Sequence, residues 1–168
     1  TNASIAVHAA EQDAVPLILV LGQVSREELT RGAFQEVDYS KFFGGIAKGV
    51  YEMTDGAKAG ELFARAFNLA AKGTPGPVIL SLPEDAQDDE AGEVVPPANP
   101  LPAVHHSDAD TTRLQAMIDA AERPLLVAGS CFRGEAGANA LRRFADAQRM
   151  PVALTWKNQD VFDNGSSL

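Results

Sequence analysis

Two largely apolar runs, with an amphipathic segment between them, most strongly limit how this chain can fold. The first, "VPLILVLGQV", spans residues 15–24, and the second runs from Val78 to Leu82. Each is short enough to be a strand buried on both faces, and Pro83 ends the second. Between them, apolar residues recur at helical spacing. Strand, helix and strand in this order are typical of a parallel sheet, so we predict the α/β class.

Further helices and strands are expected on either side of these runs. Residues 1–13 begin with helix-capping residue types and predict a short buried helix. Residues 25–45 should form a polar loop or short helix, followed by a strand near 46–53. A capped helix with one apolar face and a C-terminal glycine should come next. Its caps are Thr54 and Asp55, its apolar face is Leu62, Phe63, Ala66, Phe67 and Ala70, and its glycine is Gly73.

The composition changes between Glu84 and His106. This stretch is acidic and then proline-rich, without a sustained period, which is typical of an extended interdomain linker. After it, two helical patterns alternate with the apolar runs "RPLLVAGS" and "MPVALT". We therefore predict two incomplete three-layer α/β units, parallel sheets flanked by helices, joined by an extended Pro-rich linker. The expected bounds are 1–87 for the first unit, 88–106 for the linker and 107–168 for the second unit.

Charge and composition exclude several classes of partner. The chain has 168 residues, 45% of them hydrophobic, with a net charge of −9 and a pI near 4.7. Nucleic acid and anionic membranes need a basic surface, so neither is expected to bind. No run approaches the ~18 apolar residues of a membrane span, and no signal segment is evident. A single cysteine, Cys131, fits a reducing compartment, and we expect the cytoplasm.

No residue pattern predicts a metal site. The three histidines, His8, His105 and His106, have no partners at the spacing of a structural zinc site. We interpret them as solvated or packing residues, and Cys131 as a small hydrophobe. The acidic run "EDAQDDE" at 84–90 lacks a turn-forming glycine at ligand spacing. We expect its charged side chains to be exposed to solvent.

One turn could bind the phosphate of a nucleotide. "AGSCFRGEAG", which contains Gly129 and Ser130, lies between a predicted strand and a predicted helix, where backbone N–H groups favour anions. It lacks the full G-x-G-x-x-G pattern, so a plain turn between strand and helix remains the alternative. "GTPGPV" has no GK[ST] ending, and a turn explains it.

The residues with most chemical promise follow the first apolar run. Gly22 and Gln23 should lie at the carboxyl end of a buried strand, where open α/β sheets bind ligands. In "GAFQEVD", residues 32–38, Phe34 offers an apolar wall beside Gln35, whose amide can donate and accept. Such a pair suits a pocket that orients a small polar substrate. A loop anchored by one phenylalanine is the alternative reading.

These motifs together resemble a known enzyme family. "VPLILVLGQV", "GAFQEVD" and "GTPGPVILSLPEDAQ", in this order and spacing, are similar to the pyrimidine-binding domain of the thiamine diphosphate enzymes, in the acetolactate synthase-like branch. The resemblance covers residues 1–87. It continues more loosely into the family's central domain, where "PLLVAGS" and "MPVALTWKNQDVFDN" fit.

The resemblance implies a thiamine diphosphate-dependent lyase or transferase that decarboxylates a small 2-oxo acid. In that family the activating glutamate lies earlier in the first domain, and the Mg²⁺-diphosphate motif lies in a third domain. The chain starts without Met and stops in a loop-like stretch, so we expect a catalytically incomplete fragment. The complete enzyme would be a homodimer or homotetramer. A noncatalytic nucleotide- or partner-binding protein on the same scaffold is the alternative.

Five residues take roles from the family pattern. Phe34 and Gln35 would line the substrate side of the active site, across a subunit interface. Gly22 and Gln23 would shape the sheet edge beneath them, and Glu36 would be structural. Flavin-binding members tend to be glycine-rich after the strand that precedes Gly129. "AGSCFRG" has fewer glycines, which argues against FAD.

Overall fold

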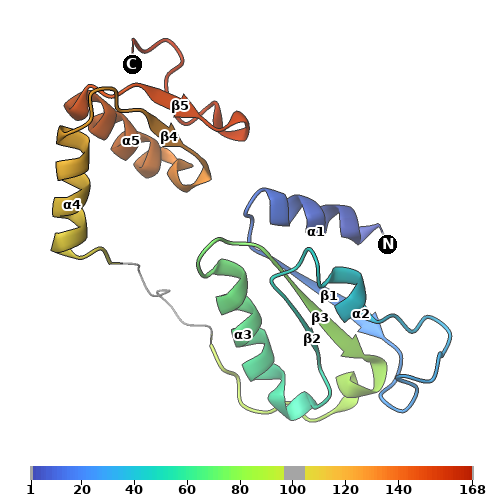
Figure 1. Cartoon of the computed structure of the whole chain (residues 1–168). Helices are drawn as coiled ribbons and strands as arrows, with labels where there is room; N and C mark the ends of the chain where they lie inside the picture. The colour runs from blue at the N-terminus through green and yellow to red at the C-terminus, as the bar shows by residue number, and fades with distance from the viewer. Residues whose placement is uncertain (1, 97–104, 168) are drawn as a thin grey trace. The chain divides into compact units, whose positions relative to one another are not determined.

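The chain folds into two compact units, Thr1–Ala103 and Val104–Leu168. The computed structural model describes residues 2–96 and 105–167, so the part of the predicted linker at 97–104 lies outside the described residues. Both units contain parallel strands with helices packed against them (Figure 1). The predicted α/β class is therefore confirmed. Assignment of the units to particular enzyme domains stays a prediction.

The first unit is a three-stranded parallel sheet with helices between the strands. The strand order is β1-β3-β2, and both pairings are parallel, so all three strands end at the same edge. The elements in chain order are α1 (Ala3–Gln12), β1 (Leu17–Gln23), α2 (Tyr39–Phe43), β2 (Gly49–Glu52), the 3₁₀ helix η1 (Gly56–Lys58), α3 (Ala59–Ala71), β3 (Pro77–Pro83) and the 3₁₀ helix η2 (Glu84–Asp88).

Helices cover both faces of this sheet. On one face, Ala66 and Ala70 of α3 pack against Val78 and Leu80. On the other face, α1 and α2 contribute Val7 and Phe43, which pack around Ile79. Successive side chains of β3 point to opposite faces, so a strand that is apolar except for the buried Ser81 fills both cores. The two-sided burial predicted for residues 78–82 is confirmed.

The first apolar run is less buried than predicted. Within the described residues β1 pairs only with β3, at the edge of the sheet, and Val20 is 44% exposed. The expected burial of this strand on both faces is therefore wrong for part of its length. An edge strand has a neighbour on one side only, and the apolar run itself does not indicate its place in a sheet.

The second unit repeats the alternation on a smaller scale. Its two strands are parallel, and Leu141 and Ala145 of the longer helix pack against Ala128. Among the described residues, no helix is long and apolar enough to span a bilayer. The elements are α4 (Asp108–Asp119), β4 (Leu126–Ala128), the 3₁₀ helix η3 (Ser130–Phe132), α5 (Glu135–Gln148), β5 (Val152–Leu154) and the 3₁₀ helix η4 (Trp156–Asn158).

Candidate functional site

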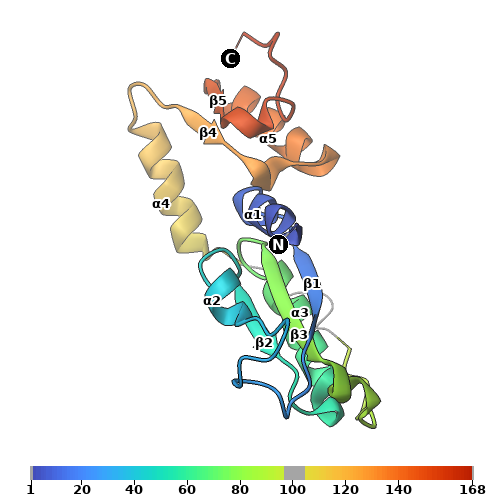
Figure 2. The same ribbon diagram turned by 90° about the vertical axis from the view of Figure 1, so that its right-hand side faces the viewer.

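Three segments gather at the carboxyl edge of the first sheet. They are residues 24–38 after β1, residues 53–58 after β2, and residues 84–89 after β3. The segment after β1 extends beyond the end of the strands in both views (Figures 1 and 2). Since open α/β sheets bind ligands at this edge, the candidate site is expected among these segments.

A pocket of about 580 Å³ lies at this edge and contains three of the four residues predicted from the sequence there. Gly22, Gln23 and Gln35 all line it, although Gln35 lies in a different segment from the other two. Phe34 does not line it, and its side chain is 90% exposed. The complete lining is Gly22, Gln23, Val24, Gln35, Val37, Tyr39, Glu84 and Gln87.

Gln23 holds the two ends of the segment after β1 together. Its side chain is buried, and its amide nitrogen donates to the carbonyl oxygen of Val37 at 2.8 Å. Its amide oxygen accepts from the backbone N–H of Val24 at 3.0 Å. Nearby, the Tyr39 hydroxyl donates to the carbonyl oxygen of Gly22 at 2.9 Å. Gln23 therefore fixes the shape of the pocket wall, with both ends of its amide engaged.

Glu36 orders the tip of the same segment. Its carboxylate accepts backbone N–H groups from Thr30 at 2.6 Å, Gly32 at 2.8 Å and Ala33 at 3.2 Å. These hydrogen bonds, that from Thr30 above all, favour the charged form and lower the pKa of Glu36. The carboxylate is thus the centre of a tight loop whose backbone turns around it.

The loop holds Gln35 in a conformation that the residue disfavours. Gln35 has φ 69°, in the left-handed region, directly between exposed Phe34 and anchored Glu36. A non-glycine residue there costs roughly 1–2 kcal/mol, and such strain concentrates at functional sites. The bonds to Glu36 can offset this cost. Gln35 is therefore held at the pocket by its neighbour.

Sequence reasoning missed an ion-pair cluster at the same edge. Arg26 binds Asp85 at 2.7 Å and Asp89 at 2.8 Å, and it lowers the pKa of both carboxyl groups. The acidic run was expected to be solvated, and that expectation is wrong for these two residues. The sequence could have predicted this cluster. Arg26 follows one strand, the acidic residues follow the neighbouring parallel strand, and both strands end at the same edge of the sheet.

The predicted nucleotide turn lies in the second unit. Gly129 follows β4 directly, and Ser130 begins η3. Gly129 is extended, and its carbonyl oxygen accepts the Phe132 N–H at 3.2 Å. This is the position between a strand and a helix that the sequence predicted. Nucleotide binding there stays a prediction.

Known proteins similar to this chain are acetolactate synthases and a carboligase. No protein-family model matches the chain. The acetolactate synthase large subunit of Parasynechococcus marenigrum is 32% identical over 174 residues, covering 100% of this chain and 28% of the relative. That of Corynebacterium glutamicum is 33% identical over 173 residues, with the same coverage of each chain. The glyoxylate carboligase of Escherichia coli O157:H7 is 30% identical over 158 residues, covering 92% of this chain and 26% of the relative.

The similarity extends along the whole chain, but it spans only part of each relative. The chain is about 28% as long as the acetolactate synthase subunits that it matches. The resemblance carried by the motifs of the first unit is thereby confirmed, and it includes the second unit. Along its whole length, this chain is homologous to a segment of the acetolactate synthase-like enzyme family.

Proposed function

We propose that this chain is a segment of a thiamine diphosphate-dependent enzyme that decarboxylates a small 2-oxo acid and joins the resulting unit to an acceptor. The observation that carries the proposal is the pocket that Gly22, Gln23 and Gln35 share at the carboxyl edge. It lies in a chain homologous to acetolactate synthases and a glyoxylate carboligase. The enzyme would be classed as a lyase or a transferase.

Apart from the carboxylate of Glu84 at its rim, the pocket offers neutral hydrogen-bonding groups beside aliphatic walls. Gln35 can donate to a keto or carboxylate oxygen and accept from a hydroxyl, while Val24 and Val37 provide an apolar wall. Gln23 and Tyr39 hold the pocket wall through bonds to Val37 and Gly22. The role proposed for this chain is therefore to bind and orient the substrate.

These residues fit a neutral ring or a 2-oxo acid better than a metal ion. Within residues 2–96 and 105–167, no group of three or more His, Cys, Asp or Glu side chains gathers at metal-binding distance. Following the family pattern, we assign Mg²⁺ and the diphosphate to protein outside this chain. When bound, thiamine diphosphate supplies the electron sink that 2-oxo acid decarboxylation requires. FAD is not part of the proposal.

The remaining assignments follow the family pattern. Residues 1–87 would belong to the pyrimidine-binding domain, and residues 107–168 to the central domain. Catalysis would need the rest of the protein, in a cytoplasmic homodimer or homotetramer. The exposure of Phe34 supports this arrangement, because a phenylalanine 90% exposed on an ordered loop suits burial against another subunit.

The test is CO₂ release by the complete protein over a panel of 2-oxo acids, with and without thiamine diphosphate and Mg²⁺. Release that requires both additives would support the proposal and identify the substrate. If no 2-oxo acid releases CO₂ and thiamine diphosphate does not bind, the proposal is wrong. The noncatalytic alternative would then take its place.

A further inference from the structure

We propose that Arg26 is a positioning residue, which fixes the segment that presents Phe34 and Gln35 by tying it to the segments that follow β2 and β3. This inference rests on the proposed function. It assigns Arg26 no contact with the substrate. The guanidinium acts through the backbone of residues 24–38, whose shape decides where the Gln35 amide lies.

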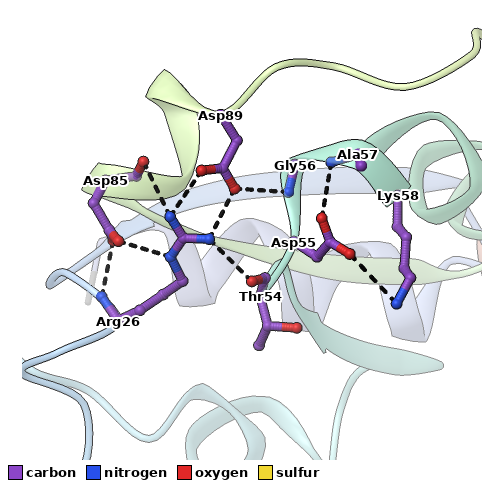
Figure 3. Close-up of polar contacts among 8 residues, drawn as sticks. All are labelled: Arg26, Thr54, Asp55, Gly56, Ala57, Lys58, Asp85 and Asp89. Carbon is purple, nitrogen blue, oxygen red and sulfur yellow. Dashed lines mark hydrogen bonds and ion pairs between the residues drawn. The ribbon is translucent and has the colours of Figure 1, made fainter.

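One side chain joins all three segments of the carboxyl edge. Arg26 lies after β1, and its Nε donates to Asp85 Oδ2 at 2.7 Å, in η2 after β3. Its Nη1 donates to the carbonyl oxygen of Thr54 at 3.1 Å, after β2. Nη1 and Nη2 each donate to one carboxylate oxygen of Asp89 at 2.8 Å. Figure 3 shows the guanidinium between the two aspartates, with Thr54 beside it.

The backbone of Arg26 is held as firmly as its side chain. Its N–H donates to Asp85 Oδ1 at 2.8 Å, so the two oxygens of Asp85 bind the N–H and the Nε of the same residue. The start of residues 24–38 is thereby fixed to η2. Together with the Gln23–Val37 bond and the Glu36 carboxylate, this gives the segment an anchor at its start, its tip and its end.

The hydrogen bonds that the Arg26 guanidinium already makes exclude a direct role of this side chain in substrate binding. A guanidinium has five N–H donors. Four of them donate to Asp85, Asp89 and Thr54 at 2.7–3.1 Å, and Nη2 also faces the carbonyl oxygen of Asp85 at 3.5 Å. No strong donor is left for the carboxylate of a 2-oxo acid. The positive charge is also paired with two negative charges.

The acceptors of Arg26 are themselves fixed. Asp89 Oδ2 also accepts the backbone N–H of Gly56 at 2.9 Å. A Cβ at Gly56 would overlap with the Cβ of Asp89, and one at Gly92 would overlap with the carbonyl oxygen of Ala57. The chain after η2 therefore packs at backbone distance on η1. An arginine bound to rigid acceptors transmits that rigidity to its own segment.

A neighbouring ion pair provides a matched control. Lys58 binds Asp55 at 3.4 Å within the same turn, and the Lys58 side chain is 74% exposed (Figure 3). By contrast, the side chains of Arg26 and Asp89 are only 32% and 27% exposed. The exposed pair joins no separate segments, and such pairs contribute little. Removing it should leave residues 24–38 unchanged.

The experiment compares Arg26→Lys, Asp89→Asn and the control Lys58→Gln in the complete protein. Lysine keeps the charge but cannot form the planar, two-pronged bonds. The first readout is tryptic cleavage after Arg31, an exposed residue in the tip of the segment, followed by mass spectrometry. The second is kcat for CO₂ release at saturating substrate, thiamine diphosphate and Mg²⁺, beside the affinity for thiamine diphosphate.

We expect Arg26→Lys and Asp89→Asn to raise cleavage after Arg31 at least about fivefold, as local opening becomes easier. Both should lower kcat about tenfold with unchanged affinity for thiamine diphosphate, whereas Lys58→Gln should change neither readout. Unchanged cleavage in both variants overturns the inference, and so does faster cleavage with unchanged kcat. If the wild-type protein releases no CO₂, the proposed function fails. Cleavage alone then supports or overturns the anchoring of the segment by Arg26.

Discussion

The side-chain amide of Gln23 donates to the carbonyl oxygen of Val37 at 2.8 Å, and this bond closes the segment that carries the candidate site. The two residues are 14 positions apart in the chain. Between them lie Arg26, bound to the neighbouring segments, and Glu36, around which the tip folds. The site is thus an anchored loop at a sheet edge, whose shape depends on a few specific polar bonds.

Gln23→Met should destabilise the first unit while conserving side-chain size. The carbonyl oxygen of Val37 and the N–H of Val24 would lose their partners, at a cost of about 2 kcal/mol. Native-state hydrogen exchange at the β3 amides measures the change. Gln87→Met is the matched control, since Gln87 lines the same pocket but is exposed. Equal stability of the two variants would show that the Gln23 amide does not hold the segment.

The order of the loop tip should depend on the charge of Glu36. Its pKa lies below the ordinary value of 4.5 because backbone N–H groups bind the charged form. Because the pKa is lower in the folded state, the stabilisation that these hydrogen bonds give is complete at pH values above the ordinary pKa. It is lost as the pH falls through the lowered value. Protection of the Thr30 and Gly32 amides from exchange should therefore be full at neutral pH and fall below pH 4.5.

Glu36→Gln tests the same carboxylate at constant pH. Glutamine keeps one acceptor oxygen but places an NH₂ group where the second accepts, so the protection of Thr30 or Gly32 should fall at neutral pH. Glu27→Gln removes an exposed charge from the same segment and should leave both amides protected. Full protection of both amides in Glu36→Gln would contradict the central place of this carboxylate.

Adding one methyl group at Gly60 tests whether residues 89–95 pack on the rest of the first unit. Gly60 in α3 lies so close to the carbonyl oxygen of Glu93 that an added Cβ would overlap with it. Gly60→Ala should therefore destabilise the unit by roughly 1–3 kcal/mol. Gly45→Ala faces open space and should be neutral or up to ~1 kcal/mol stabilising. Urea unfolding measures the free energy of unfolding of both variants. If Gly60→Ala is neutral, residues 89–95 do not pack on α3, as expected for the extended linker predicted from composition.

Local patterns in the sequence predicted most of the secondary structure. The apolar run from Val78 to Leu82 lies within β3, and Asp55 caps η1 by accepting the N–H of Ala57. Gly73 has φ 65°, as expected for a glycine that ends a helix. These features are determined by residues close together in the chain. The exposure of Val20 was missed because it depends on which strands lie beside β1.

The sequence predicted where the residues of the candidate site lie but not their hydrogen bonds, and their role in binding stays a prediction. Gln23 and Gln35 were predicted from their places at a strand end and in the following loop, and they do line one pocket. The pairing of Arg26 with Asp89 joins residues 63 positions apart, and charged residues in a polar stretch ordinarily remain solvated. The left-handed conformation of Gln35 was equally hidden, because the residue type does not favour it. The hydrogen bonds from the backbone of Thr30 and Gly32 to the carboxylate of the adjacent Glu36 maintain it.

The central claim is that the carboxyl edge of the first unit faces a reacting 2-oxo acid. Its most direct test is the rate of CO₂ release by the complete protein carrying Gln35→Ala, compared with Gln87→Ala from the same pocket. Gln35→Ala should lower this rate about tenfold or more, because one hydrogen bond to a charged group is worth ~1.5–3 kcal/mol. Gln87→Ala should be close to wild type. Equal rates for the two variants and the wild type, across all substrates, would remove Gln35 from the site and contradict the account.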